Sequence, residues 1–220
     1  MKSRYRILYL FDIDGTLADM EKVHVKAYQM AYKNVLGFVP GSNVISRQFG
    51  NVERQIHEAI FTHYKIRDRK KVSEVIRAYT KFVAAAVKKS KVRTLPGARR
   101  IISELARKKQ LLGVVTGNSR KIGQAILRKI KLLHYFKIQS YGAVDKRAHI
   151  VRTAIQMAKK KGLKFDKVIV FGDSVFDVHA AKENKALSVA IATGKYSLEE
   201  LKKEKPDLAL KSLRDYAAMW

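Results

Sequence analysis

Hydrophobic residues follow two different patterns along the chain. Residues 5–11 (YRILYLF) form a continuous apolar and aromatic run, typical of a strand buried on both faces, and the run stops at Asp12. Between there and about residue 90, apolar residues recur at helical spacing, which predicts three helices and no strand, over residues 21–36, 51–64 and 70–89. Gly37 supplies a predicted C-terminal cap for the first of these helices.

After Pro96 and Gly97 the pattern changes to short apolar runs that alternate with helical segments. Strands are predicted near residues 111–115, 137–141, 167–171 and 187–191. Helices are predicted near residues 98–109, 120–131 and 148–161, the last of them capped by Gly162, and a short helix is predicted to end at residue 183. A closing helix and strand follow near residues 198–210. Alternation of this kind indicates βαβ units on a parallel sheet with helices on both faces.

The expected fold class is therefore α/β, a Rossmann-like three-layer core around a parallel sheet. An all-helical segment is inserted after the first strand, and an insertion at that point is expected to act as a cap. We expect residues 1–18 and 93–220 to form the core domain and residues 19–92 to form the helical cap domain.

Charge widens the range of partners to consider. The chain has 46 Lys and Arg against 19 Asp and Glu, a formal net charge of +27, and such a field attracts nucleic acid, acidic membranes or anionic substrates. The basic residues are dispersed over many predicted helices, however, which favours a lysine-rich surface over a single nucleic-acid site. Nucleic acid stays a possible partner that the pattern does not favour, and no oligomeric state is assigned.

Composition excludes several classes of site. There are no cysteines, so a disulfide framework, a thiolate metal site and a cysteine nucleophile are excluded. No window approaches the roughly 18 consecutive apolar residues of a membrane span, and Asp12 and Asp14 interrupt the N-terminal apolar run where a signal peptide tolerates no charge. A cytoplasmic protein is expected. His24, His57 and His63 show no metal-ligand clustering, and we expect them to be surface or helix-packing residues.

Acidic side chains follow two of the predicted strands. Asp12 and Asp14 come directly after the first strand, and Asp173 and Asp177 come after a later one. Ligands bind in open α/β sheets at the carboxyl ends of the strands, so these acids are expected to converge on a site for a hard cation. Two acids placed together would repel each other without such a cation.

The segment Asp-x-Asp-Gly-Thr at residues 12–16 is also the signature of the haloacid dehalogenase superfamily. Residues 114–118 (VVTGN) resemble its second motif, Lys146 or Arg147 occupies the region of its third, and residues 171–177 (FGDSVFD) resemble its fourth. The closing residues 193–201 and 206–208 look like the terminal part of its phosphoglycolate phosphatases. The resemblance therefore covers essentially the whole chain.

This resemblance implies a magnesium-dependent phosphatase. Asp12 is then the nucleophile that forms an aspartyl phosphate, and Asp14 is the general acid and base. It also implies that Mg²⁺ is bound by Asp12, by Asp173 and by the backbone carbonyl of Asp14. Thr116, Gly117 and Asn118 are the implied ligands of the substrate phosphate, together with the third-motif cation, Lys146 or Arg147. Arg147 is favoured because it leads directly into the next helix, and Asp177 is expected to orient that cation or a metal-bound water.

A cap over the site favours a small phosphomonoester, namely phosphoglycolate, a sugar phosphate or a nucleotide, over a phosphoprotein. Arg47 and Arg54 in the cap are candidates to meet an anionic leaving group. A phosphomutase of the β-phosphoglucomutase type is the alternative enzyme, although such mutases often carry a different residue at the position of Thr16. A basic nucleic-acid-associated protein is the alternative from another class.

Overall fold

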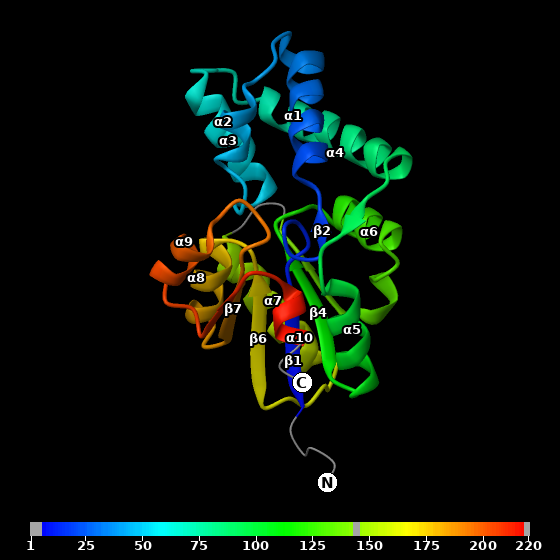
Figure 1. Cartoon of the computed structure of the whole chain (residues 1–220). Helices are drawn as coiled ribbons and strands as arrows, with labels where there is room; N and C mark the ends of the chain where they lie inside the picture. The colour runs from blue at the N-terminus through cyan, green and yellow to red at the C-terminus, as the bar shows by residue number, and fades with distance from the viewer. Residues whose placement is uncertain (1–5, 143–145, 218–220) are drawn as a thin grey trace.

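The computed structural model describes residues 6–142 and 146–217, and it contains a six-stranded parallel sheet (Figure 1). The strand order is β5-β4-β1-β6-β7-β8. The strands are β1 (Ile7–Phe11), β4 (Leu111–Thr116), β5 (Ile138–Tyr141), β6 (Lys167–Gly172), β7 (Leu187–Ile191) and β8 (Leu208–Leu210). The chain builds β4 and β5 on one side of β1 and then crosses to the other side, so the strand order reverses beside β1, where open α/β sheets bind ligands.

Helices cover both faces of the sheet, which confirms the predicted three-layer core. Leu8 and Leu10 of β1 pack into one apolar layer, and Tyr9 and Phe11 pack into the layer on the opposite face. Because both faces are buried, the strand is apolar at every position rather than alternating. The first layer includes α7 (Arg147–Lys160) and α8 (Val175–Glu183), with α9 (Leu198–Lys203) beside α8, and the second includes α5 (Ala98–Arg107), α6 (Arg120–Lys129) and α10 (Leu213–Ala217).

The four helices that follow β1 in the chain lie above the carboxyl ends of the strands (Figure 1). We call them the helical insertion: α1 (Glu21–Leu36), α2 (Ser42–Ser46), α3 (Glu53–His63) and α4 (Lys71–Lys89). Two short strands, β2 (Ala18–Asp19) and β3 (Arg93–Thr94), pair antiparallel where the chain enters and leaves the insertion. The sequence predicted three helices and no strand here. It missed α2, β2 and β3 because segments of five and two residues carry no recognisable periodicity.

The insertion has an aromatic interior that continues into the core layer beneath it. Tyr28 stacks on Tyr79 with ring centroids 4.1 Å apart, and Tyr32 stacks on His57 at 5.8 Å. His57 is fully buried, and its Nε2 has no hydrogen-bond partner among the described residues. It is thus a helix-packing residue, as expected, and His63 is exposed. None of the described helices is long and apolar enough to cross a bilayer.

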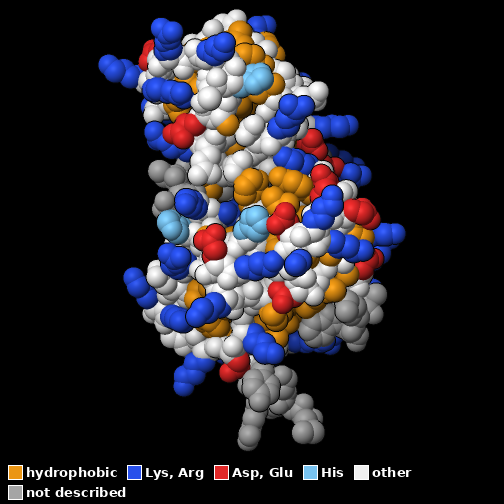
Figure 2. Space-filling view, turned by 90° about the vertical axis from the view of Figure 1, so that its left-hand side faces the viewer, with side chains coloured by type: hydrophobic (Ala, Val, Ile, Leu, Met, Phe, Trp, Pro, Cys, Tyr) orange, Lys and Arg blue, Asp and Glu red, His pale blue; other side chains and the backbone are white. Residues whose placement is uncertain are grey.

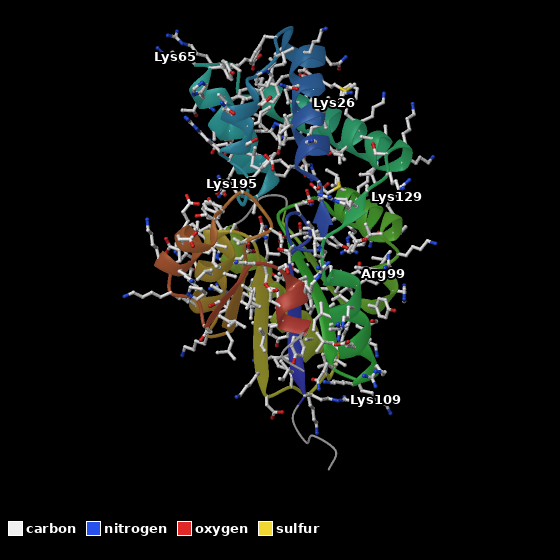
Figure 3. All side chains as sticks on the ribbon, in the orientation of Figure 1. Lys26, Lys65, Arg99, Lys109, Lys129 and Lys195 are labelled. Carbon is white, nitrogen blue, oxygen red and sulfur yellow. The ribbon has the colours of Figure 1, made fainter. Side chains whose placement is uncertain are left out.

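Lysine occupies the left-handed position after five helices. The φ angles lie between 49° and 57°, and each residue stands two positions beyond the last helical residue: Lys65, Lys109, Lys131, Lys185 and Lys205. All five are exposed, and Figure 3 labels Lys65 and Lys109 at the turns after α3 and α5. In the described part of the chain, glycine in a left-handed conformation ends a helix only at Gly37 and Gly162, the two caps that the sequence predicted.

Burial lowers the pKa of His57 from its usual 6.5 to about 3. Between these values the unfolded chain binds one more proton than the folded chain, so the free energy of unfolding decreases as the pH falls through this window. We expect the wild type to lose about 2 kcal/mol more than His57→Phe between pH 7.5 and pH 5 in urea titrations. His63→Phe, at an exposed position, is the control and should lose as much as the wild type. Equal losses in wild type and His57→Phe would contradict this account.

Candidate active site

Four carboxylates and one guanidinium lie together at the carboxyl ends of β1 and β6. Asp12 and Asp14 follow β1, Asp173 follows β6, and Asp177 lies in the first turn of α8. The backbone N–H of Asp12 donates to the carbonyl of Phe171 at 2.9 Å, which extends the pairing of the two strands to the first acid. Carboxylate oxygens of Asp12, Asp173 and Asp177 lie within 4.8 Å of one another. The structure therefore brings the two predicted acidic segments together.

Arg147, the first residue of α7, is the cation within this cluster. Its Nη2 lies 2.6 Å from Asp12 Oδ1 and donates to Asp177 Oδ1 at 2.7 Å, and its Nε donates to the same oxygen at 2.9 Å. The other oxygen of Asp177 accepts hydrogen bonds from Ser174, from the backbone N–H at 3.1 Å and from the hydroxyl at 2.5 Å. Asp177 thereby orients Arg147, whereas the side chain of Lys146 is exposed.

One guanidinium leaves the cluster short of positive charge. Burial raises the pKa of Asp12 well above its usual range although Arg147 opposes the rise. Burial also raises the pKa of Asp173 to about 8, and Asp177 adds to that rise. Asp12 Oδ1 is buried and makes no hydrogen bond with any described residue, despite its short contact with Arg147. Converging carboxylate oxygens of this kind are the donors that Mg²⁺ prefers.

Two glycines make room for Asp173. A Cβ atom on Gly15 would lie 2.3 Å from Asp173 Oδ2, and one on Gly194 would lie 1.6 Å from the same oxygen. Thr16 donates a weak hydrogen bond to the other oxygen, at 3.4 Å. The loops after β1 and β7 therefore enclose this carboxylate on both sides, and a larger residue at either glycine would displace it.

Asp14 has different partners from the other three acids. Its Oδ2 accepts a hydrogen bond from Asn118 Nδ2, and its Oδ1 lies 3.0 Å from Nε2 of His24 on α1. His24 Nδ1 lies 2.7 Å from the hydroxyl of Tyr79 on α4. The tautomer with hydrogen on Nε2 satisfies all three groups, because Nδ1 then accepts from the tyrosine and Nε2 donates to the carboxylate. A chain of hydrogen bonds thus connects Asp14 to the helical insertion.

The loop after β4 is held between Arg147 and the insertion. Thr116 is buried, and its hydroxyl accepts a hydrogen bond from the backbone N–H of Asn118 at 3.2 Å. A Cβ atom on Gly117 would lie 2.8 Å from the carbonyl oxygen of Asn51 and 3.2 Å from Arg147 Nη1. Only a residue without a side chain therefore fits at Gly117 in this arrangement. Gly117 and Asn118 face the pocket described next, and Thr116 lies behind them.

A pocket separates the strand ends from the helical insertion. The core contributes Asp12, Asp14, Gly15, Gly117, Asn118, Arg147, Asp173, Gly194, Lys195 and Tyr196 to its wall. The insertion contributes Glu21, His24, Tyr28, Phe49, Gly50, Asn51, Glu53, Ile56 and Tyr79. Figure 3 places Lys195 at the junction of the two parts.

Several of these wall residues differ from the sequence-based expectations. His24, Glu53 and Lys195 were not predicted as site residues, because their place depends on how the insertion docks on the core. Arg47 and Arg54, which were candidates to meet the substrate, do not line the pocket. Arg54 instead pairs with Glu58 on the exposed side of α3, at 2.9 Å, and the side chain of Arg47 is exposed.

The fold and site define a doubly wound α/β protein with an acidic centre at the carboxyl edge of its sheet. Residues 9–191 match the haloacid dehalogenase-like hydrolase family, so the chain belongs to that family. Relatives include a Clostridium perfringens protein with the provisional name pyrophosphatase PpaX, 21% identical over 199 residues (90% of this chain, 89% of the relative). A phosphoglycolate phosphatase from Nitrosococcus oceani is 23% identical over 211 residues (94% and 92%).

A solved structure has the same fold. It is a variant of CbbY from Rhodobacter sphaeroides in complex with xylulose-(1,5)bisphosphate, with a TM-score of 0.80, 21% identity, and coverage of 94% of this chain and 95% of that one. The prediction of a phosphoglycolate phosphatase-like enzyme of this superfamily, with a Rossmann-like α/β core, is confirmed. The enzyme class that was predicted, a phosphoric monoester hydrolase, agrees with these relatives.

The two adjacent cations differ in what their loss should do to stability. Arg147→Met leaves Asp12 and Asp177 buried without their cationic partner, and we expect the free energy of unfolding to fall by about 3 kcal/mol. Lys146→Met removes an exposed charge and should change it by less than about 0.5 kcal/mol. Urea titrations of both variants in metal-free buffer measure the difference. Similar values for the two variants would show that Arg147 does not stabilise the cluster.

Proposed function

We propose that this protein is a magnesium-dependent phosphatase that hydrolyses small phosphomonoesters through an aspartyl phosphate on Asp12. The observation that carries the proposal is the cluster of Asp12, Asp173 and Asp177 at the carboxyl ends of the strands, with Asp12 and Asp173 in the wall of a pocket. A carboxylate nucleophile needs this placement because it must reach a substrate in the pocket and have neighbouring oxygen donors that can hold a cation. The names of the relatives, which include a phosphoglycolate phosphatase, support the same chemistry.

The residues present fit a magnesium ion. We expect Asp12, Asp173 and the backbone carbonyl of Asp14 to hold it, with Asp177 in support through Arg147 or a water. Bound Mg²⁺ supplies neutralisation of the phosphate oxygens, which would otherwise repel an attacking carboxylate. Burial and the neighbouring Asp177 raise the pKa of Asp173, and a divalent cation beside this carboxylate would oppose that rise.

The side chains of this chain then divide the work between two half-reactions. Asp12 attacks phosphorus, the bond from phosphorus to the ester oxygen breaks, and Asp14 gives a proton to the departing oxygen. In the second half-reaction Asp14 takes a proton from the water that attacks the aspartyl phosphate, which releases Asp12 and inorganic phosphate. Thr116, Gly117, Asn118 and Arg147 are the proposed partners of the phosphoryl oxygens. His24 and Asn118 hold the carboxylate of Asp14 in place for both transfers.

We propose further that residues 19–92 act as a cap domain over a core of residues 1–18 and 93–220. Support comes from α3, whose first backbone N–H donates to the carbonyl of Gly117 at 3.2 Å. A cap in this position keeps water and bulky substrates from the reacting atoms. On the face drawn in Figure 2, Lys and Arg are spread among acidic and apolar side chains, a distribution that favours a small substrate over a nucleic acid.

The first test compares phosphate release by wild type and Asp12→Asn with a panel of small phosphomonoesters, with and without Mg²⁺. We expect release that requires Mg²⁺ in the wild type and at least a 1000-fold lower rate in Asp12→Asn, because an amide is not a nucleophile. Asp68→Asn, at an exposed position outside the pocket, is the matched control and should keep the wild-type rate. Metal-independent release, or activity that survives in Asp12→Asn, would refute the mechanism.

A second test isolates the role of His24. If His24 positions Asp14 for proton transfer, His24→Phe should lower kcat by about 10- to 100-fold for an alkyl phosphate, whose leaving oxygen needs a proton. The loss should be much smaller for p-nitrophenyl phosphate, because nitrophenolate leaves without one. His63→Phe serves as the control on an exposed histidine. An equal loss for both substrates would mean that His24 supports the fold of the pocket and has no part in proton transfer.

A further inference from the structure

We propose that the pocket selects phosphomonoesters whose leaving group carries hydroxyl or ammonium groups and rejects those with a second anionic group, and that Glu53 makes this selection. The inference rests on the proposed phosphatase function and deepens it by naming the substrate class. It separates this protein from an enzyme for phosphoglycolate or pyrophosphate, whose leaving groups carry a negative charge.

The charge of the pocket wall is the first observation. Among the described residues, the part of the wall that the insertion contributes contains two carboxylates, Glu21 and Glu53, and no Lys or Arg. This is the reverse of the whole chain, in which 46 basic residues outnumber 19 acidic ones. Arg54 follows Glu53 in the sequence, yet it pairs with Glu58 outside the pocket. The region that faces the leaving group is thus acidic on a strongly basic protein.

The second observation is how firmly Glu53 is held. It is the first residue of α3, it is 5% exposed, and its Oε2 accepts a hydrogen bond from the backbone N–H of Ser119 at 3.1 Å. Its Oε1 accepts from the hydroxyl of Thr80 at 3.4 Å. Burial raises the pKa of Glu53, and the hydrogen bond from Ser119, the neighbouring His24 and the hydrogen bond from Thr80 oppose that rise. The side chain is therefore fixed on the loop that follows Thr116, next to the proposed phosphate subsite.

Both cations in the core part of the wall already have partners within the protein. Arg147 is held by Asp12 and Asp177. Lys195 donates a hydrogen bond to the carbonyl of Arg47 at 2.8 Å, and burial lowers its pKa while Asp173 opposes the fall. Arg147 is thus paired with two acids, Lys195 is bonded to a backbone carbonyl, and neither cation lies on the insertion.

These contacts decide between leaving groups by their charge. A carboxylate or phosphate on the leaving group would lose its hydration shell in the pocket and would be repelled by the negative charge of Glu53. A hydroxyl would instead donate a hydrogen bond to Glu53, and an ammonium would form an ion pair with it. Tyr28, Phe49 and Tyr79 add aromatic surface to the same end of the pocket, against which the carbon skeleton of a polyol or sugar can pack.

Three substrates of nearly equal size test the proposal: 2-phosphoglycolate, 2-hydroxyethyl phosphate and phosphoethanolamine. Their leaving groups carry a negative charge, no charge and a positive charge, respectively. We expect wild-type kcat/KM to be at least about 10-fold higher for the neutral and the cationic substrate than for phosphoglycolate. Glu53→Gln should narrow that ratio at least about fivefold, mainly because it raises the rate with phosphoglycolate. Glu58→Gln, on the exposed side of the same helix, should leave the ratio unchanged.

The outcomes separate this proposal from the proposed function. A wild type that prefers phosphoglycolate, or an unchanged ratio in a Glu53→Gln variant with a native circular dichroism spectrum, overturns the selection by Glu53 and leaves the phosphatase intact. If Glu53→Gln does not fold, the wild-type ranking of the three substrates alone decides. No magnesium-dependent release from these substrates or from p-nitrophenyl phosphate overturns both proposals.

Discussion

Repulsion between carboxylates at one edge of the sheet is the constraint on which the rest of the structure depends. Asp12, Asp173 and Asp177 are brought within 4.8 Å of one another, and water screens their charges only weakly because Asp12 and Asp177 are buried and Asp173 is half-buried. Arg147 offsets part of this charge, and Ser174 offsets another part through its hydrogen bonds to Asp177. Burial, together with the repulsion that remains, raises the pKa of Asp12 and Asp173, and a cation bound at this edge would oppose that rise. Stability and chemistry therefore oppose each other at this edge.

The topology explains how such a cluster can form from distant segments. β1 lies between β4 and β6, so the turns that follow three strands open at one edge. Each turn supplies a different part: acids after β1 and β6, and the loop of Gly117 and Asn118 after β4. The helical insertion then covers the edge and adds its own polar groups, among them His24 on Asp14 and Glu53 on Ser119. The pocket is a joint product of the two parts.

Local patterns were enough to predict the core but not the wall contributed by the insertion. The buried strands are recognisable in the sequence as apolar runs, and the acids that follow two of them mark the carboxyl ends of strands that lie side by side in the sheet. Arg147 could be preferred over Lys146 because it begins a helix next to those strands. His24 and Glu53 have no comparable signal in the sequence. Each contributes to the site only through a partner in the core, and these partners lie ten residues from His24 and more than sixty residues from Glu53. Arg47 and Arg54 were chosen as basic residues of the predicted cap, and neither charge nor place in the cap says which side of a helix faces the pocket.

The lysines after five helices bear on the origin of the net charge. In the left-handed conformation an L-residue costs about 1 kcal/mol relative to glycine, and a cation at a helix C-terminus recovers about 0.3 to 1 kcal/mol of that. Lysine and glycine are therefore close to interchangeable at Lys65, Lys109, Lys131, Lys185 and Lys205, and these sites are scattered over both the core and the insertion. The excess of lysine thus extends even to turn positions where glycine would serve. It is a property of the whole composition, and it requires no binding partner to explain it.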